Sequence, residues 1–224
     1  TWPWAKKPNP NPRSLCLYQN DGSARFRDVT EEAGLNRNIY GVGPCVGDFD
    51  NDGWQDLFVT CVGKNLLFKN NGGKFTDVSE PAHVAGDENA WSSGAVWFDY
   101  DNDGRLDLFV CDYVLWSRDL DLSLGFSLTG VGRAFGQPTL FTGTQSHLYH
   151  NDNDGKFTEV SKEMGIQVVN PDTQVPVGKG LGVAAVDVDH DGWVDLVVAN
   201  DTVQNFLFMN RAGKGFQESG VSMG

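Results

Sequence analysis

One nine-residue pattern occurs three times in this chain, and it constrains the fold more than any other feature. Aspartate occupies positions 1, 3, 5 and 9, glycine occupies position 6, and an apolar run follows. The copies are DFDNDGWQD at 48–56, DYDNDGRLD at 99–107 and DVDHDGWVD at 187–195. A motif that returns in the same register indicates a repeat fold, in which each copy adds one structural unit.

A second motif alternates with these acid turns. It starts with a Leu-aromatic pair, passes through an Asn/Gly-rich turn and ends in a short strand-like run, with copies at 17–30, 67–79, 148–161 and, more loosely, 207–219. The Asn and Gly residues supply the positive φ angles that tight β-hairpins need. One acid turn and one hairpin together predict four antiparallel strands in about 50 residues, which is the content of a β-propeller blade.

The chain is therefore predicted to be all-β, with three blades of four antiparallel strands and an additional half blade. We expect the half blade at 15–29 and the blades at about 42–79, 94–160 and 181–219, with an insertion at about 112–146. Because propellers usually close with roughly four to eight blades, this is either a partial propeller or one that another copy completes. The proline-rich residues 1–14 predict an extended lead-in to the propeller segment at 15–224.

The acid turns have the donor set of a calcium site. Alternate positions of a curling loop direct oxygen atoms at one point, and several carboxylates with one backbone carbonyl, from position 7, suit a large, hard cation. We therefore expect three Ca²⁺ sites. Their predicted ligands are Asp48, Asp50, Asp52, Trp54 and Asp56 in the first turn, Asp99, Asp101, Asp103, Arg105 and Asp107 in the second, and Asp187, Asp189, Asp191, Trp193 and Asp195 in the third.

Other metal sites fit the turns less well. An EF-hand needs a bidentate Glu at position 12 and flanking helices, whereas position 12 is Val59, Val110 or Val198 in a strand-like run. Magnesium demands tighter octahedral geometry, and zinc or copper favours His or Cys, which occupy no predicted ligand position. His147 and His150 are three residues apart in a strand, so we expect them on opposite faces.

Ordinary turns also contain Asp and Gly. Three copies in one register, each with four acids, favour metal binding over that explanation, because uncompensated carboxylates at one point would repel each other.

Charge and cysteine content limit the remaining possibilities. The formal net charge is −13, from 30 acidic and 17 basic residues, which argues against nucleic acid as a partner. No apolar run is long enough to predict a membrane span. The four cysteines, at 16, 45, 61 and 111, lack the paired spacing of a zinc site. Cys45 and Cys61 flank the first acid turn, so they either face each other across a hairpin or serve as small buried apolar residues.

These motifs resemble a known family. The acid turns followed by Asp-Leu-Phe-Val resemble FG-GAP/VCBS repeats, the calcium-binding blades of integrin-α-like β-propellers. The segment LYQNDGSARFRDVTEEAGL at 17–35 and DYVLWS at 112–117 are most similar to the cartilage acidic protein/ASPIC-UnbV family. This resemblance implies a secreted or cell-surface protein that binds calcium and acts as an adhesion or scaffold module without catalysis.

Three functions remain open from the sequence. The first is a calcium-binding extracellular structural or adhesion module, in which Ca²⁺ stiffens the blades for a protein partner or for self-association, including a filament built through open blade edges. The second is lectin-like glycan binding by aromatic residues of the insertion (Trp116, Phe126, Phe135 and Phe141), which otherwise pack the insertion onto its own blade. The third, a polysaccharide-active enzyme, needs a general acid or base outside the turns, and no catalytic motif stands out. The sequence favours a protein that is not an enzyme.

Overall fold

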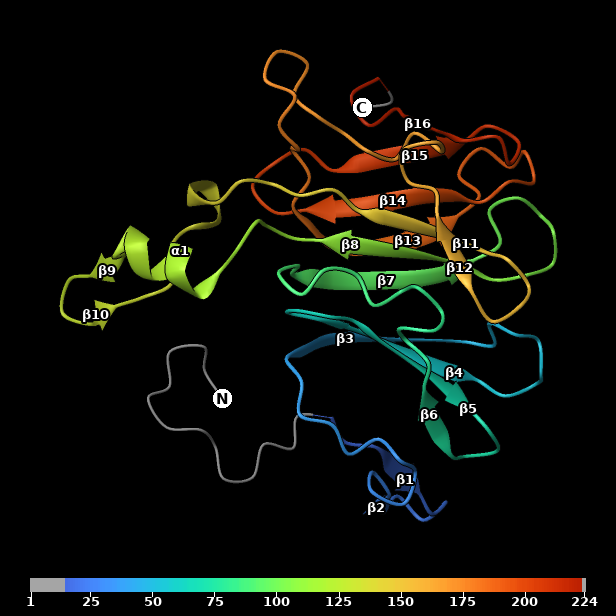
Figure 1. The fold of residues 1–224 in the computed structure, drawn as a ribbon. Helices are drawn as coiled ribbons and strands as arrows, with labels where there is room; N and C mark the ends of the chain where they lie inside the picture. The colour runs from blue at the N-terminus through green and yellow to red at the C-terminus, as the bar shows by residue number, and fades with distance from the viewer. Residues whose placement is uncertain (1–14, 223–224) are drawn as a thin grey trace.

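The structure is a computed structural model that describes residues 15–222. The expected lead-in at 1–14 lies outside the described residues. The described part contains sixteen β-strands, one short α-helix and one 3-10 helix (Figure 1). None of the helices within 15–222 has the length and apolar character needed to cross a lipid bilayer.

Three four-stranded antiparallel sheets make up most of the molecule, and we call them blades 1 to 3. Their strand orders are β3-β4-β5-β6, β7-β8-β11-β12 and β13-β14-β15-β16. The strands are β3 (Gly41–Gly47), β4 (Asp56–Cys61), β5 (Leu66–Asn70) and β6 (Phe75–Asp77) in blade 1; β7 (Ser92–Phe98), β8 (Asp107–Asp112), β11 (His147–Asn151) and β12 (Phe157–Glu159) in blade 2; and β13 (Gly180–Val186), β14 (Asp195–Asn200), β15 (Phe206–Asn210) and β16 (Phe216–Glu218) in blade 3.

A two-stranded hairpin, β1 (Tyr18–Asn20) with β2 (Phe26–Asp28), precedes blade 1. In Figure 1 the blue-to-teal blade 1 lies below the green-to-yellow blade 2, and the orange-to-red blade 3 lies above it. The predicted all-β fold, with three and a half propeller-type blades that do not close on themselves, is thereby confirmed.

The first strands of the blades, β3, β7 and β13, lie side by side. Glycine permits this close approach: a Cβ atom on Gly94 of β7 would lie 3.2 Å from the Cα atom of Gly182 in β13. Each first strand also has a register shift at the same place, between residues 41 and 43, 92 and 94, or 180 and 182. The repeated bulge and the glycine after it therefore set how closely neighbouring blades pack.

The hydrophobic core lies between successive blades. Phe49, at position 2 of the first acid turn, stacks on Trp97 of blade 2 with ring centroids 6.1 Å apart, and Phe157 packs against both rings. Tyr100, at position 2 of the second turn, packs against Phe216 of blade 3 in the same way. Because aromatic side chains carry much of the apolar area of a core, the first and second acid turns are each anchored by the blade that follows them.

Asparagine side chains form a polar ladder beside this core. Asn151 of blade 2 donates from Nδ2 to the Phe49 carbonyl at 2.7 Å and to the Leu106 carbonyl at 3.0 Å. Asn210 of blade 3 repeats the arrangement with the Tyr100 and Val194 carbonyls at 2.8 and 3.0 Å. In blades 2 and 3, the last residue of the third strand thus ties its own turn to the turn of the preceding blade.

The turns themselves are also linked in a row. The position 4 side chain Asn51 donates to the carbonyl of Gly104 in the second turn at 3.1 Å, and Asn102 donates to the carbonyl of Gly192 in the third at 3.3 Å. All three acid turns therefore lie at the same end of the blade stack.

The segment between β8 and β11 projects from blade 2 (Figure 1). It contains α1 (Arg118–Leu124), β9 (Ser127–Leu128), β10 (Gly132–Arg133) and the 3-10 helix η1 (Pro138–Leu140). Ser117 caps α1 by accepting a hydrogen bond from the Leu120 N–H. Asp121 of α1 is buried and pairs with Arg133 of β10 at 2.7 Å, which ties the helix to the small hairpin.

Cys45 does not face Cys61 across the first hairpin, so that alternative is wrong. The acid turn pairs Gly47 with Asp56, which places Cys45 opposite Phe58, and the register shift places Cys61 opposite Gly41. All four thiols are free. Cys61 and Cys111 are buried among apolar side chains, as the other alternative expected.

Candidate metal centre

The three acid turns have one backbone shape. Position 4 adopts a left-handed conformation, with φ of 56° at Asn51, 58° at Asn102 and 62° at His190. The glycine at position 6 has a φ of 85–90° in all three turns. No atom lies within 4 Å of where a Cβ on these glycines would be, so the requirement for glycine is conformational rather than steric.

The carboxylates at positions 1 and 5 close the loop on itself. Asp48, at position 1, accepts from the backbone N–H groups of Asp52 at 3.0 Å and Gly53 at 2.8 Å. Asp99 and Asp187 accept from the equivalent N–H groups of their turns. The position 5 carboxylates of Asp52, Asp103 and Asp191 each accept from the N–H of position 7 at 2.9 Å. These bonds curl the loop so that its carboxylates converge.

The aspartate at position 9 joins each turn to the third strand of its blade. Asp56 is fully buried and accepts from the Phe49 N–H at 3.1 Å and from the Asn70 N–H at 2.7 Å. Asp107 and Asp195 make the same pair of bonds in their own blades. Burial raises the pKa of Asp56 to about 6 and the pKa of Asp107 to about 7, although these N–H donors oppose the rise. A cation beside them would favour the ionised form.

The carboxylates whose oxygen atoms lack a hydrogen-bond partner are at position 3. The Oδ1 atoms of Asp50 and Asp101 are buried and have no hydrogen-bond partner. The third turn differs, because Oδ1 of Asp189 accepts from the Asp191 N–H at 3.3 Å. A buried carboxylate oxygen without a donor is costly, and a metal ion bound there would remove that cost. This chemistry fits an oxygen-ligated cation.

In each turn, carboxylate oxygens from three residues lie within 4.8 Å of one another. The groups are Asp48, Asp50 and Asp56; Asp99, Asp101 and Asp103; and Asp187, Asp189 and Asp195. Oxygens that ligate one calcium ion at about 2.3–2.6 Å lie at most twice that distance apart. Asp52, Asp107 and Asp191 fall outside these groups. The proposed carbonyl ligands at Trp54, Arg105 and Trp193 remain predictions.

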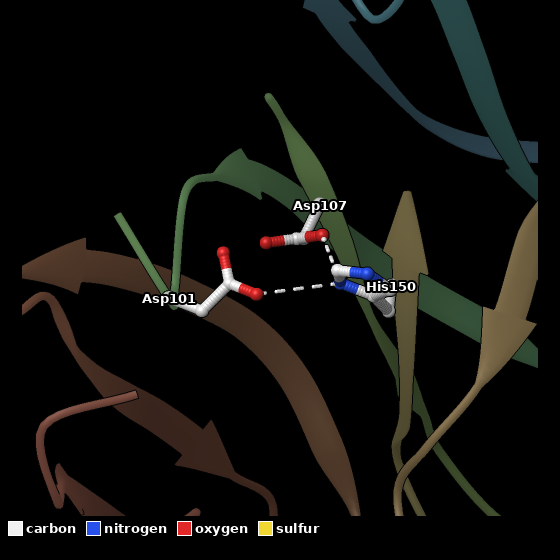
Figure 2. A group of neighbouring side chains, drawn as sticks. All are labelled: Asp101, Asp107 and His150. Atoms are coloured by element: carbon white, nitrogen blue, oxygen red, sulfur yellow. Dashed lines mark ion pairs between the residues drawn. The ribbon is translucent and has the colours of Figure 1, made fainter. Parts of the chain in front are cut away.

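A histidine on β11, which the sequence reasoning did not place at a metal site, lies beside the second turn. Figure 2 shows the imidazole of His150 beside two carboxylates, with Nδ1 3.6 Å from Asp101 Oδ2 and 3.3 Å from Asp107 Oδ1. The Tyr100 hydroxyl is 3.4 Å from the same nitrogen. These atoms of His150, Asp101 and Asp107 form a further candidate ligand group.

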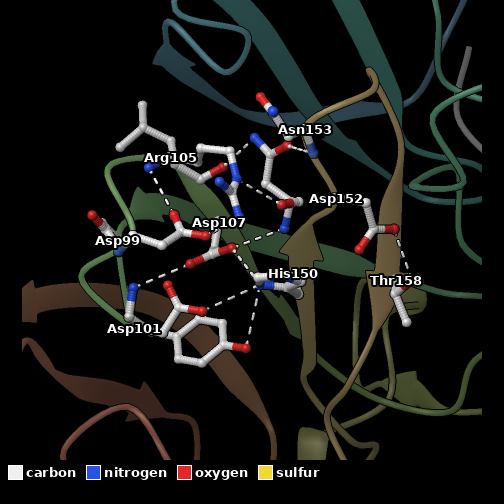
Figure 3. A network of polar contacts seen from close by, with 12 residues as sticks. Asp99, Asp101, Arg105, Asp107, His150, Asp152, Asn153 and Thr158 are labelled. Atoms are coloured by element: carbon white, nitrogen blue, oxygen red, sulfur yellow. Dashed lines mark hydrogen bonds and ion pairs between the residues drawn. The ribbon is translucent and has the colours of Figure 1, made fainter.

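Arg105, at position 7 of the second turn, connects this turn to β11 as well. Its guanidinium pairs with Asp103, and its Nε donates to the carbonyl of Asn151 at 3.1 Å (Figure 3). The second turn is therefore connected to its own third strand through both Arg105 and His150.

The first turn holds a lysine where the second holds a histidine. The ammonium of Lys69 on β5 contacts Asp50 and lies 3.2 Å from Asp52 Oδ2. Its hydrogen bond to Asp50 raises the pKa of Lys69 above its ordinary value. The pKa of Asp52 is lowered, first by the hydrogen bond from the Trp54 N–H and further by Lys69.

The third turn has neither of these basic side chains. Among residues 15–222, no ion pair joins a Lys, Arg or His side chain to the aspartates of this turn. Met209, which is buried, occupies the strand position of Lys69 and His150. The three hairpin motifs share the sequences LFKN, LYHN and LFMN. The residue before their common asparagine is the sequence signal for this position.

Three of the four insertion aromatics in the glycan-binding hypothesis border one cavity. Trp116, Phe135 and Phe141 line a space of about 170 Å³, together with Trp91 and Tyr113 of blade 2. Trp116 packs edge-on against Trp91, with ring centroids 5.6 Å apart. Phe126 is not among the lining residues.

The fold and its acid turns define a β-propeller-type repeat protein. Comparison with family signatures matches the FG-GAP-like repeat over residues 8–59, 48–110 and 136–198, which together cover more than half of the chain. The chain belongs to the FG-GAP-like repeat family.

Among individual proteins, the chain is similar to cartilage acidic protein 1 of Mus musculus and Homo sapiens. It is 27% identical to each over 228 residues, which cover 88% of this chain and 35% or 34% of the relative. The chain thus spans about a third of the length of these curated relatives. A solved structure of an Agrocybe aegerita lectin, described as recognising non-reducing terminal N-acetylglucosamine, has a TM-score of 0.43 and 15% identity, covering 93% of this chain and 48% of that one.

Proposed function

We propose that this chain is a calcium-binding structural module in which Ca²⁺ ions in the three acid turns stiffen adjacent blades. The observation that carries the proposal is that carboxylate oxygens from three residues lie within 4.8 Å of one another in every turn. The unsatisfied oxygens of Asp50 and Asp101 support it, because a cation is the missing partner that both would accept.

In each turn the ion would be held by the carboxylates at positions 1, 3, 5 and 9 and by the position 7 carbonyl, as the sequence pattern predicts. The position 9 aspartate also bonds to the third strand, so an ion bound there would connect the turn to the rest of its blade. Three divalent ions carry six positive charges and would reduce the formal net charge from −13 to −7. The ions therefore act on stability, by relieving repulsion between carboxylates.

An extracellular or cell-surface location suits such sites, because calcium sites of extracellular modules commonly have dissociation constants of about 10⁻⁴ to 10⁻³ M. The similarity to cartilage acidic protein 1 supports a structural or adhesive role there. The partner would be another protein or a second copy of the chain.

A non-catalytic role is part of the proposal. Outside the turns, Ser92, Asp112 and His147 lie close together, but they are not arranged as a nucleophilic triad. The Ser92 hydroxyl donates to Asp112 at 2.7 Å instead of contacting the imidazole, and His147 lies 3.5 Å from Asp112 and 3.6 Å from Glu159. A histidine between two carboxylates does not activate the serine, since the base must accept the serine proton.

Thermal unfolding tests the proposal, with calcium, with magnesium or with a chelator. At ten times its dissociation constant, each calcium site would add about 1.4 kcal/mol to the free energy of unfolding. For a chain of this size, three sites would raise the melting temperature by roughly 10 °C. Asp189→Asn should reduce this calcium-dependent rise by about a third, on the same arithmetic.

Asp154→Asn is the matched control, because Asp154 is an exposed hairpin carboxylate that pairs only with Lys156 among the described contacts. It should leave the calcium response unchanged. If calcium and magnesium gave the same melting curve as the chelator, the turns would be ordinary turns and the proposal would fail.

The aromatic cavity supports a second candidate function, which is glycan binding. Rings such as those of Trp91, Trp116 and Phe135 can stack on the apolar face of a sugar, and the cavity of about 170 Å³ is open beside them. Titration with a panel of soluble glycans tests it. Trp116→Ala should abolish binding, and Trp54→Ala, at an exposed tryptophan of the first turn, should not. Absence of binding by the unaltered chain would reject this candidate.

A further inference from the structure

One position on the third strand of each blade differs in charge while its surroundings repeat. The residue is Lys69 in blade 1, His150 in blade 2 and Met209 in blade 3. Each precedes the asparagine whose backbone N–H donates to the position 9 aspartate, at 2.7, 2.9 and 2.7 Å. Because these bonds fix the same register in all three blades, the preceding residue has the same relation to each acid turn. We call it the facing residue.

In blade 1 the facing residue carries a full positive charge into the turn. The Lys69 ammonium contacts Asp50 at position 3 and lies 3.2 Å from Asp52 at position 5. The Lys69 side chain is about two-thirds buried, with 32% of it exposed, so it is not a freely solvated surface lysine. Two of the four carboxylates that would bind calcium in this turn are therefore already neutralised in part by the chain itself.

The other two turns lack this ammonium. In the second turn, His150 brings an imidazole nitrogen to Asp101 and Asp107 (Figure 2), and the Arg105 guanidinium pairs with Asp103. Met209 brings no charge, and within residues 15–222 no Lys, Arg or His forms an ion pair with the third turn. The three turns have the same ligand pattern, but they differ in the charge that an incoming cation meets.

We propose that the facing residue sets the calcium affinity of each turn, and that Lys69 makes the first turn a weaker site than the third by acting as a built-in competitor. This inference rests on the proposed calcium binding. A calcium ion among these carboxylates would lie only a few ångströms from the ammonium, where repulsion between the charges is strong. Calcium must therefore displace Lys69 or bind beside it, whereas the third turn imposes no such requirement.

Substitution of Lys69 by Met, the facing residue of blade 3, tests the inference. Tryptophan at position 7 makes turns 1 and 3 separately readable, because Trp54 and Trp193 can sensitise the luminescence of a Tb³⁺ ion bound next to them, while turn 2 has Arg105. The Trp193→Phe variant lacks the luminescence signal of turn 3. Subtracting the luminescence of the double variant, Trp54→Phe with Trp193→Phe, from that of Trp193→Phe leaves the signal of turn 1. Calcium is then titrated against bound Tb³⁺.

We expect Lys69→Met to tighten calcium binding at turn 1 by about tenfold or more, since one full charge is removed from contact with the ligands. Lys69→Arg keeps the charge and should keep the affinity of the unaltered chain. Lys64→Met is the matched control, because Lys64 is exposed and pairs with Glu80 rather than with a turn. It lowers the net charge equally and should leave turn 1 unchanged.

Circular dichroism in chelator shows whether each variant is folded before its titration, and Lys69→Gln replaces Lys69→Met if the latter is not. Equal calcium affinity at turn 1 with Lys, Met or Gln at position 69 would overturn the inference while leaving calcium binding intact. Absence of binding at every turn would instead reject the proposed function itself.

Discussion

The asparagine ladder yields a prediction with a matched internal control. Asn151→Ala removes two hydrogen bonds from buried carbonyls, one to Leu106 in its own blade and one to Phe49 in blade 1. Asn70→Ala, at the equivalent position of blade 1, removes the bond to the Gln55 carbonyl in its own blade. Both asparagines also accept one hairpin N–H, from Asn153 or Gly73. The two substitutions therefore differ chiefly by the single bond that joins blade 1 to blade 2.

The expected difference follows from the cost of an orphaned buried carbonyl, which is about 1–3 kcal/mol. Asn151→Ala should lower the free energy of unfolding by that amount more than Asn70→Ala does. Urea denaturation followed by tryptophan fluorescence at saturating calcium measures both. Asn210→Ala should resemble Asn151→Ala, because Asn210 makes the same pair of bonds to Tyr100 and Val194. If Asn151→Ala and Asn70→Ala lowered the free energy of unfolding by amounts that agree within about 0.5 kcal/mol, the claim that the ladder couples the blades would be refuted.

Three further predictions concern single positions. Asp56→Asn should lower the free energy of unfolding by about 1–3 kcal/mol even in chelator, and urea denaturation measures this. The new amide N–H₂ group would face one of the two backbone N–H donors, so that donor would lose its acceptor. Gly47→Ala should cost about 1–3 kcal/mol in the same assay, since its Cβ would lie 2.7 Å from Trp97 Cδ1. At pH 8 a thiol reagent should modify exposed Cys16 rapidly and spare Cys61 until the chain unfolds, because burial raises the pKa of Cys61 to about 11. Rapid labelling of Cys61 in the folded protein would contradict the last prediction.

The repeats explain why the blades could be predicted from sequence. The glycine at position 6 and the Asn/Gly turns of the hairpins need positive φ angles that few other residues adopt, so they mark each reversal of the chain directly. The apolar runs between them then fix four strands for each unit. The half blade and three blades followed from these signals alone.

Neighbours across strands could not be predicted in the same way. His150 is 43 residues from Asp107 in sequence, and their contact depends on the register between β8 and β11. The same dependence made Cys45 and Cys61 ambiguous, because flanking a turn does not fix which residues are paired when the first strand contains a bulge. The segment between β8 and β11 occurs once, so no repeat guided its fold.

The direction of the asparagine ladder has a consequence for how such chains grow. Each blade presents carbonyl acceptors on one side and amide donors on the other, so Asn151 reaches back to Phe49 while Asn210 reaches back to Tyr100. The contact is head-to-tail, and an interface of this kind can be repeated without limit or closed into a ring. Duplication of one unit would therefore add a blade, an acid turn and both halves of a matching interface together. Array length can change by whole units while every internal donor keeps an acceptor.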